Sequence, residues 1–159
     1  MLEEQAYEYL LAAYIMEVQL RYRKFIYNGF VEEQLKQVAN CLTANTAKFG
    51  IVLCGGCGNG KTTMLKALQN LVRRLEILKP NLSPNAGHSS DNYYSFTIVN
   101  AMQIVQIRKT DYNKFCKLAK ADMLGIDDIG TEPAEVQDYG NFMYPIKELL
   151  AMRYDAQLF

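Results

Sequence analysis

Eight consecutive residues near the middle of the chain have the types and spacing of a phosphate-binding loop. Residues 55–62 read Gly-Gly-Cys-Gly-Asn-Gly-Lys-Thr and match the pattern G-x-x-x-x-G-K-[ST] at every position. Glycines let a backbone bend around a polyanion with its N–H groups pointing inward, because they lack a Cβ atom. Lys61 is expected to contact the β and γ phosphates, and the Thr62 hydroxyl to bind Mg²⁺. We interpret the segment as a Walker A loop.

The loop predicts a site for ATP with Mg²⁺. Thr63, one residue further along, is expected to add a contact near the α-phosphate. The expected nucleotide-binding residues are Gly55, Gly56, Cys57, Gly58, Asn59, Gly60, Lys61, Thr62 and Thr63. Cys54 and Cys57 also form a C-x-x-C pair, but no second pair with metal-ligand spacing accompanies it, so neither structural zinc nor redox chemistry is favoured.

Two adjacent acids supply the second half of such a site. Asp127 and Asp128 directly follow the apolar segment 123–126. A Mg²⁺ ion held by one hydroxyl and by phosphate oxygens also takes a carboxylate, so Asp127 is the expected metal neighbour and Asp128 the expected general base. Acids after a strand are also common turn formers. With Lys61 present upstream, we favour a Walker B strand, with Lys61 and Asp128 as the catalytic residues.

Two weaker candidates lie between these motifs. Asn100 follows a predicted strand and could hold Asp128 in an inactive rotamer, although a plain turn residue is the simpler interpretation. Lys109, Lys114 and Lys117 belong to a basic stretch that could contact DNA, whereas such stretches most often form a solvated helix face.

The surrounding elements are predicted from hydrophobic periodicity and chain-breaking residues. Strands are expected at 49–54, 95–99 and 122–127, the first of them buried on both faces. Helices are expected at 2–27, 31–42, 61–78, 102–108 and 111–119. Residues 136–157 carry a helical pattern interrupted by Gly140 and Pro145, and residues 79–94 form a long connection that is expected to be mobile and contains His88.

The bulk composition is that of one ordinary globular domain. The chain has 159 residues, 50% of them hydrophobic, and 17 basic against 17 acidic side chains. These values exclude disordered and collagen-like chains, and any contact with nucleic acid must come from a local patch. The longest apolar run, residues 10–16, is too short to span a bilayer and no leader precedes it, so we expect a cytoplasmic protein without membrane contact.

Together these motifs resemble the AAA+ ATPases of the bacterial helicase-loader group, of the DnaC and DnaI kind, and the related IstB-type transposase helpers. The resemblance rests on residues 55–62, on Leu124-Gly-Ile-Asp-Asp-Ile-Gly130 and on Arg153-Tyr154, and it covers residues 31–159. It implies a P-loop NTPase fold of three α/β/α layers, with a parallel five-stranded sheet in the order 5-1-4-3-2. Residues 1–45 are then an N-terminal helical segment and residues 46–159 the ATPase core.

The resemblance also implies a role in DNA replication and the primosome. The expected partners are a replicative helicase, or a transposase in the IstB case, and single-stranded DNA, and the ATP-bound chain is expected to form a homo-oligomer. The sequence ends where relatives begin the fourth strand, which predicts a core truncated after the third strand and its following helix. A nucleotide-gated interaction module without hydrolysis therefore remains an alternative to an active ATPase.

Overall fold

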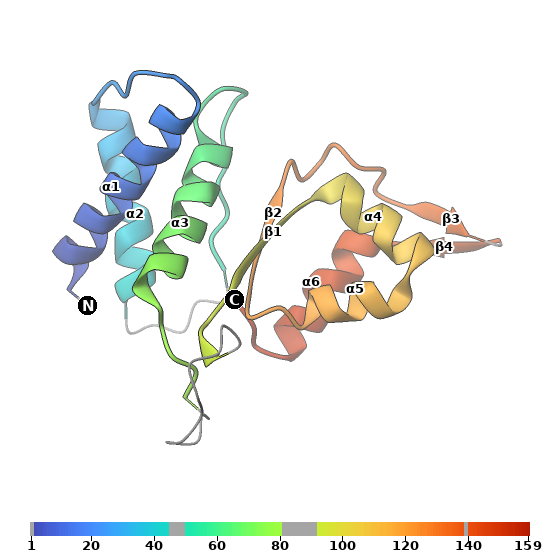
Figure 1. Cartoon of the computed structure of the whole chain (residues 1–159). Coiled ribbons are helices and arrows are strands. Elements are labelled where there is room, and N and C mark those ends of the chain that lie inside the picture. The colour runs from blue at the N-terminus through green and yellow to red at the C-terminus, as the bar shows by residue number, and fades with distance from the viewer. Residues whose placement is uncertain (1, 45–49, 81–91, 139) are drawn as a thin grey trace. The chain divides into compact units, whose positions relative to one another are not determined.

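The computed structural model describes residues 2–44, 50–80, 92–138 and 140–159 and has a mixed α/β structure (Figure 1). The chain divides into two compact units, Met1–Ile77 and Leu78–Phe159. The first unit contains the helices α1 (Glu3–Leu20), α2 (Gly29–Thr43) and α3 (Lys61–Leu75). The second contains β1 (Phe96–Asn100), α4 (Ala101–Thr110), α5 (Tyr112–Ala119), β2 (Met123–Asp127), β3 (Val136–Asp138), β4 (Asn141–Met143) and α6 (Pro145–Asp155).

The first unit is built around α1, which packs against both α2 and α3. The buried apolar side chains of this unit are Ala6, Leu10, Ala13, Tyr14, Leu35, Val38, Ala39, Met64, Ala67, Leu68, Leu71 and Val72. Each helix contributes one stripe at three- and four-residue spacing, as an amphipathic helix does. A buried acid also joins α1 to α3, since Glu17 accepts a hydrogen bond from Asn70.

The first helix ends at Leu20, seven residues before the predicted end at Tyr27. The N–H of Tyr22 donates to the carbonyl of Gln19, and the N–H of Arg23 to that of Val18, which is a Schellman ending. Tyr22 takes the left-handed conformation that this ending requires, with φ of 55°. The apolar pattern continues past Leu20, but the backbone has already turned. The predicted end was therefore wrong.

The predicted strand at 49–54 is absent over residues 50–54, the part that the structure describes. Its side chains are not buried on both faces, because Val52 is 83% exposed while Ile51 and Leu53 are half-buried. A strand needs a neighbour to satisfy its N–H and C=O groups, and no described residue pairs with this segment. The sequence shows that the segment is apolar, but it does not show whether another strand lies beside it.

The second unit contains a parallel pair, β1 and β2, in which Phe96 pairs with Met123 and Asn100 with Asp127. This confirms the second and third predicted strands to within one residue. A core of Val99, Ile104, Phe115, Ala119 and Leu149 joins the pair to the helices α4, α5 and α6, which lie together beside it (Figure 1). The connection from β1 to β2 through two helices is the crossover that parallel strands require.

A buried arginine holds the start of β2 in place. Arg153 in α6 is 5% exposed and donates to the carbonyls of Ala119 at 3.0 Å, Ala121 at 2.7 Å and Phe159. Because several carbonyl oxygens surround the guanidinium, its burial leaves no donor unsatisfied among the described side chains. The chain end is thereby held next to β2, where the Leu124 N–H donates to the Phe159 carbonyl at 3.1 Å.

The helical pattern predicted over residues 136–157 is correct only from Pro145 onward. The strands β3, residues 136–138, and β4, residues 141–143, form an antiparallel pair in which Val136 pairs with Met143. Gly140 lies in its turn with φ of 85°, a conformation that glycine adopts readily. Pro145 is the first residue of α6, where its missing N–H costs nothing. The expected interruption is thus a change from strand to helix.

The helices α1, α2 and α3 lie in one compact unit, and the domain boundary near residue 45 stays a prediction. At the ends of the predicted connection 79–94, the Lys79 N–H donates to the Asn92 carbonyl, and Tyr93 forms an isolated bridge with Leu78, the last residue of the predicted helix 61–78. His88 and residues 81–91 lie outside the described residues.

Candidate functional site

The glycine-rich loop leads directly into the N-terminus of α3. Gly60 is the residue before the helix and has φ of 79°, in the left-handed region, and Gly58 has φ of 83°. Lys61 is the first helical residue, and its ammonium donates to the carbonyls of Gly55 and Gly56, both at 2.8 Å. The Lys61 side chain therefore extends toward the start of the loop that precedes it. The first turn of α3 contains no acidic residue, so nothing there opposes an anion at the positive end of the helix dipole.

The first turn of α3 is contacted by an arginine from α1. Thr63 is 7% exposed, and its hydroxyl oxygen accepts a hydrogen bond from Arg21 Nη1 at 3.0 Å. This contact joins residues 42 positions apart in sequence. The sequence alone does not reveal this contact, because no spacing rule links Arg21 to the loop.

A tyrosine of α1 lies against the last glycine of the loop. A Cβ atom built on Gly60 would lie 2.4 Å from the hydroxyl oxygen of Tyr14. Burial raises the pKa of the Tyr14 phenol, and the nearby charge of Arg21 acts in the opposite direction. Gly60 is thus required twice, by its backbone conformation and by the space that Tyr14 occupies. No spacing pattern in the sequence links Tyr14 to Gly60, so this contact was not predicted.

The predicted acids and Asn100 lie together at the carboxyl ends of β1 and β2. Asn100 pairs in register with Asp127, and its side-chain amide donates to Asp128 Oδ2 at 3.0 Å. The other end of the same amide accepts from the Met102 N–H at 2.9 Å and caps α4. Asn100 therefore lies beside Asp128, the weaker of its two sequence interpretations, and an effect of this contact on activity stays a prediction.

The Asp128 carboxylate is carried on a turn that redirects the chain after β2. Asp128 is exposed and has φ of 56°, which is unusual for a residue with a side chain. Its carbonyl accepts from the N–H and the hydroxyl of Thr131, at 3.2 and 2.8 Å. Its own N–H donates to Asp127 Oδ1 at 3.1 Å. Such strained positions are held by their surroundings and cluster at functional sites.

The residues present fit a nucleotide with Mg²⁺ in their chemistry. In the described part of the chain, no group of three or more His, Cys, Asp or Glu side chains is placed to hold a metal ion. A Mg²⁺ ion bound through substrate phosphates needs only one or two protein ligands, so this finding does not conflict with Thr62 and Asp127. These two residues lie in different compact units. Their meeting stays a prediction.

The basic stretch is split by the structure. Arg108 is half-buried, pairs with Glu148 at 2.8 Å and lies 4.6 Å from the ring centre of Tyr112. The three lysines proposed for DNA contact, Lys109 in α4 and Lys114 and Lys117 in α5, are exposed. Arg108 therefore acts within the fold, and only the lysines remain for a surface contact.

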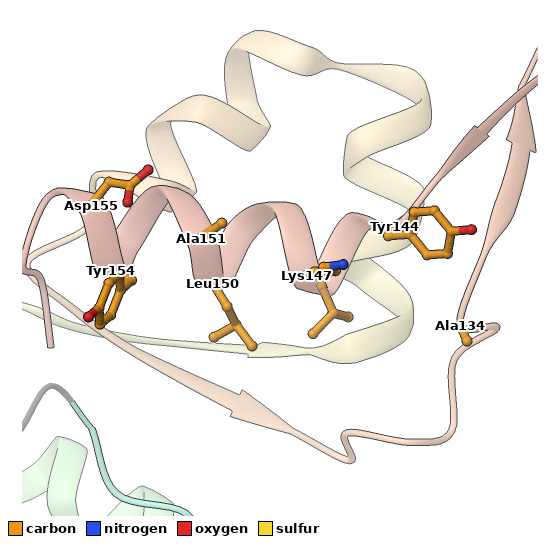
Figure 2. A pocket seen from close by; sticks show the side chains of 8 residues that line it. Ala134, Tyr144, Lys147, Leu150, Ala151, Tyr154 and Asp155 are labelled. Carbon is orange, nitrogen blue, oxygen red and sulfur yellow. The ribbon is translucent and has the colours of Figure 1, made fainter.

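Each unit contains a cavity among its described residues. A cavity of about 460 Å³ opens beside Lys61, between α2 and residues 50–54. A second, of about 650 Å³, lies along α6 in the second unit, where Leu150 and Tyr154 project from the same side of the helix (Figure 2). The residues lining the second cavity include none of the predicted site residues.

No described helix has the length and apolar character needed to cross a membrane. The comparisons with known proteins gave no match, whether with family models, curated proteins or solved structures.

Proposed function

We propose that this chain binds ATP with Mg²⁺ through residues 55–63 and acts as a P-loop ATPase of the helicase-loader type. One observation carries the proposal: the G-x-x-x-x-G-K-[ST] segment ends in a left-handed glycine, Gly60, and Lys61 begins α3. A Walker A loop requires this order of glycine loop and helix N-terminus.

The phosphate groups would be bound by backbone and lysine together. The N–H groups of a helix's first turn point along the helix axis toward its N-terminus, and the helix dipole favours an anion there. The Lys61 ammonium would exchange the carbonyls of Gly55 and Gly56 for phosphate oxygens. This exchange keeps the charge hydrogen-bonded with and without nucleotide.

Thr62 and Asp127 would hold the Mg²⁺ ion, whose charge would neutralise that of the phosphates. Asp128 would orient the attacking water and take its proton. Asn100 donates to Asp128 Oδ2, so the bond must lengthen or break before that oxygen can accept the water proton. The proposal therefore makes Asn100 a restraint on hydrolysis.

The order of the strands supports the choice of fold class. In the order 5-1-4-3-2, the second and third strands are parallel neighbours, as β1 and β2 are here. Along β2 successive N–H groups point to opposite edges: Met123 N–H donates to Ser95 beside β1, and Leu124 N–H to Phe159. The edge of β2 that carries the Met123 N–H is the one that pairs with β1, as the proposed fold class requires.

A nucleotide-gated interaction module without hydrolysis is the second candidate, and the bond between Asn100 and Asp128 favours it, because an engaged carboxylate is a poor base. A transposase helper would use the same site with another partner.

Steady-state phosphate release, measured with and without single-stranded DNA, separates the active ATPase from the interaction module without hydrolysis. We expect turnover that Asp128→Asn abolishes and that Asp155→Asn leaves intact. If the wild type and Asp155→Asn bind ATP but release no phosphate, the interaction module without hydrolysis is the supported function.

The partner is tested by immobilising the chain with ATP and Mg²⁺ and adding a purified replicative helicase or a purified transposase. If the chain is a helicase loader, it should retain the helicase and not the transposase. Retention of the transposase alone would support a transposase helper instead. Single-stranded DNA binding should weaken when Lys109, Lys114 and Lys117 are changed together to glutamine.

A further inference from the structure

Tyr14 of α1 and Arg21, the residue that ends this helix, contact the segment where the glycine-rich loop leads into α3, about 40 residues further along the sequence. Tyr14 lies against Gly60, and Arg21 donates to the hydroxyl of Thr63 at 3.0 Å. Both contacts fall where the loop becomes helix α3. Tyr14 and Arg21 therefore contact two of the residues that the proposed function assigns to the nucleotide.

The backbone of Arg21 is fixed by the way α1 ends. Arg21 is the residue at the helix end, and its N–H donates to Val18 at 3.2 Å. Tyr22 and Arg23 then complete the Schellman ending, which turns the chain away from the helix axis. The side chain of Arg21 is exposed, but its tip is anchored on the buried Thr63. A long flexible cation is thus held at one place.

The hydrogen bond also orients the Thr63 hydroxyl. A hydroxyl has one proton to donate and two lone pairs to accept with. Because its oxygen accepts from Arg21, the proton of Thr63 is free of that bond and can be donated to a phosphate oxygen. The guanidinium adds a positive charge beside the first turn of α3, where the N–H groups already favour an anion.

We propose that Arg21 is a positioning residue of the nucleotide site, which orients Thr63 toward the α-phosphate of a nucleoside di- or triphosphate. The inference rests on the proposed function. It assigns to α1 a share in ligand binding that the loop sequence alone does not contain. Since ADP and ATP share the α-phosphate, the loss of Arg21 should weaken both by the same factor.

The test measures dissociation constants of fluorescent ADP and ATP analogues with Mg²⁺ for the wild type, Arg21→Gln, Arg21→Lys, Thr63→Val and the Arg21→Gln/Thr63→Val double variant. We expect Arg21→Gln and Thr63→Val each to bind both nucleotides about tenfold more weakly, the loss typical of a hydrogen bond to a charged group. The double variant should be no more than about twofold weaker than either single variant, because both remove one interaction. Arg21→Lys should restore most of the affinity. Arg23→Gln, two residues away and exposed, is the matched control and should bind like the wild type.

The inference fails if Arg21→Gln binds both nucleotides like the wild type while Lys61→Ala does not bind. It also fails if only ATP is affected, or if the two single losses multiply in the double variant. A loss that follows a fall in melting temperature without nucleotide, and that lysine does not rescue, would mean that Arg21 only packs α1 on α3. If the wild type binds neither nucleotide, the proposed function itself fails, and this inference with it.

Discussion

The side-chain amide of Asn100 makes two hydrogen bonds with opposite ends, donating to Asp128 Oδ2 at 3.0 Å and accepting from the Met102 N–H at 2.9 Å. One residue thus caps α4 and holds the predicted general base. Both partners lie at the carboxyl ends of the parallel pair of strands, the edge at which ligands commonly bind in open α/β sheets. The capping bond from the Met102 N–H orients the Asn100 amide, and this amide in turn holds the Asp128 carboxylate.

Replacing Asn100 should separate these two roles. Asn100→Ala removes the cap and the bond to Asp128, and should lower the free energy of unfolding by about 1 kcal/mol. Asn100→Ser keeps a capping oxygen and loses only the donor to Asp128, so it should cost less than half as much. Urea unfolding measures both. Equal losses in the two variants would show that the cap contributes little.

The two left-handed glycines of the loop offer a matched pair. Gly58 and Gly60 have φ of 83° and 79°, so alanine is strained at either position by about 1 kcal/mol or more. A Cβ on Gly58 meets nothing within 4 Å, whereas one on Gly60 would lie 2.4 Å from the Tyr14 hydroxyl. Gly60→Ala should therefore destabilise more than Gly58→Ala, by about 1–2 kcal/mol.

Thermal unfolding of both alanine variants, and of Gly60→Ala combined with Tyr14→Phe, tests this difference. Removing the hydroxyl should recover part of the excess loss. Equal stability of the two single variants would mean that Tyr14 moves away without cost.

Tyr22 carries backbone strain that glycine would relieve. It has φ of 55° at the end of α1 and is fully exposed, so its side chain contributes no packing. Tyr22→Gly should raise the free energy of unfolding by about 0.5–1 kcal/mol, the strain removed less the entropy that glycine adds to the unfolded chain. Tyr22→Ala keeps the strain and should change stability by less. A destabilised glycine variant would contradict the Schellman ending.

Asp122 should make the second unit sensitive to acid. Burial raises the pKa of its carboxyl, but hydrogen bonds from Lys79 and Ser95 outweigh burial and hold the pKa below its ordinary value of 3.8. The unfolded state therefore binds more protons as the pH falls through this region. The stabilisation by Asp122 is complete above about pH 4 and is lost as the pH falls through the folded pKa.

Asp122→Asn should accordingly lower the free energy of unfolding at pH 7 by about 1 kcal/mol and flatten its decline below pH 4. Denaturant unfolding between pH 2 and pH 7 checks both effects, with Asp155→Asn as the control. An unchanged slope below pH 4 would exclude Asp122 as a source of the acid sensitivity.

The sequence predicted well what depends on local chemistry. The start of α3 at Lys61 follows from glycines before a periodic stretch, and β1 and β2 follow from short apolar runs that end in polar residues. Whether an apolar segment finds a neighbouring strand to pair with could not be predicted from its own residues. Residues 50–54 are apolar enough for a strand but find no pairing partner among the described residues.

The same limit explains the errors at the candidate site and at the chain's last third. The hydrogen bond from Arg21 to Thr63 joins two helices that only tertiary packing brings together, so no spacing rule could reveal it. The helical pattern predicted from residue 136 is replaced by the antiparallel pair of β3 and β4, with Gly140 in the left-handed conformation just before β4. The local sequence pattern identified the candidate residues, whereas tertiary packing determines which residues contact them.

The central claim is that residues 55–63 bind the phosphates of ATP. Isothermal titration of the full chain with ATP and Mg²⁺ tests it most directly, comparing the wild type with Lys61→Ala and with Lys66→Ala, an exposed lysine of the same helix. The account predicts saturable binding by the wild type and Lys66→Ala, and binding at least about 100-fold weaker for Lys61→Ala, because a charge-assisted contact is lost. Equal affinity in all three proteins, or no binding by the wild type, would contradict it.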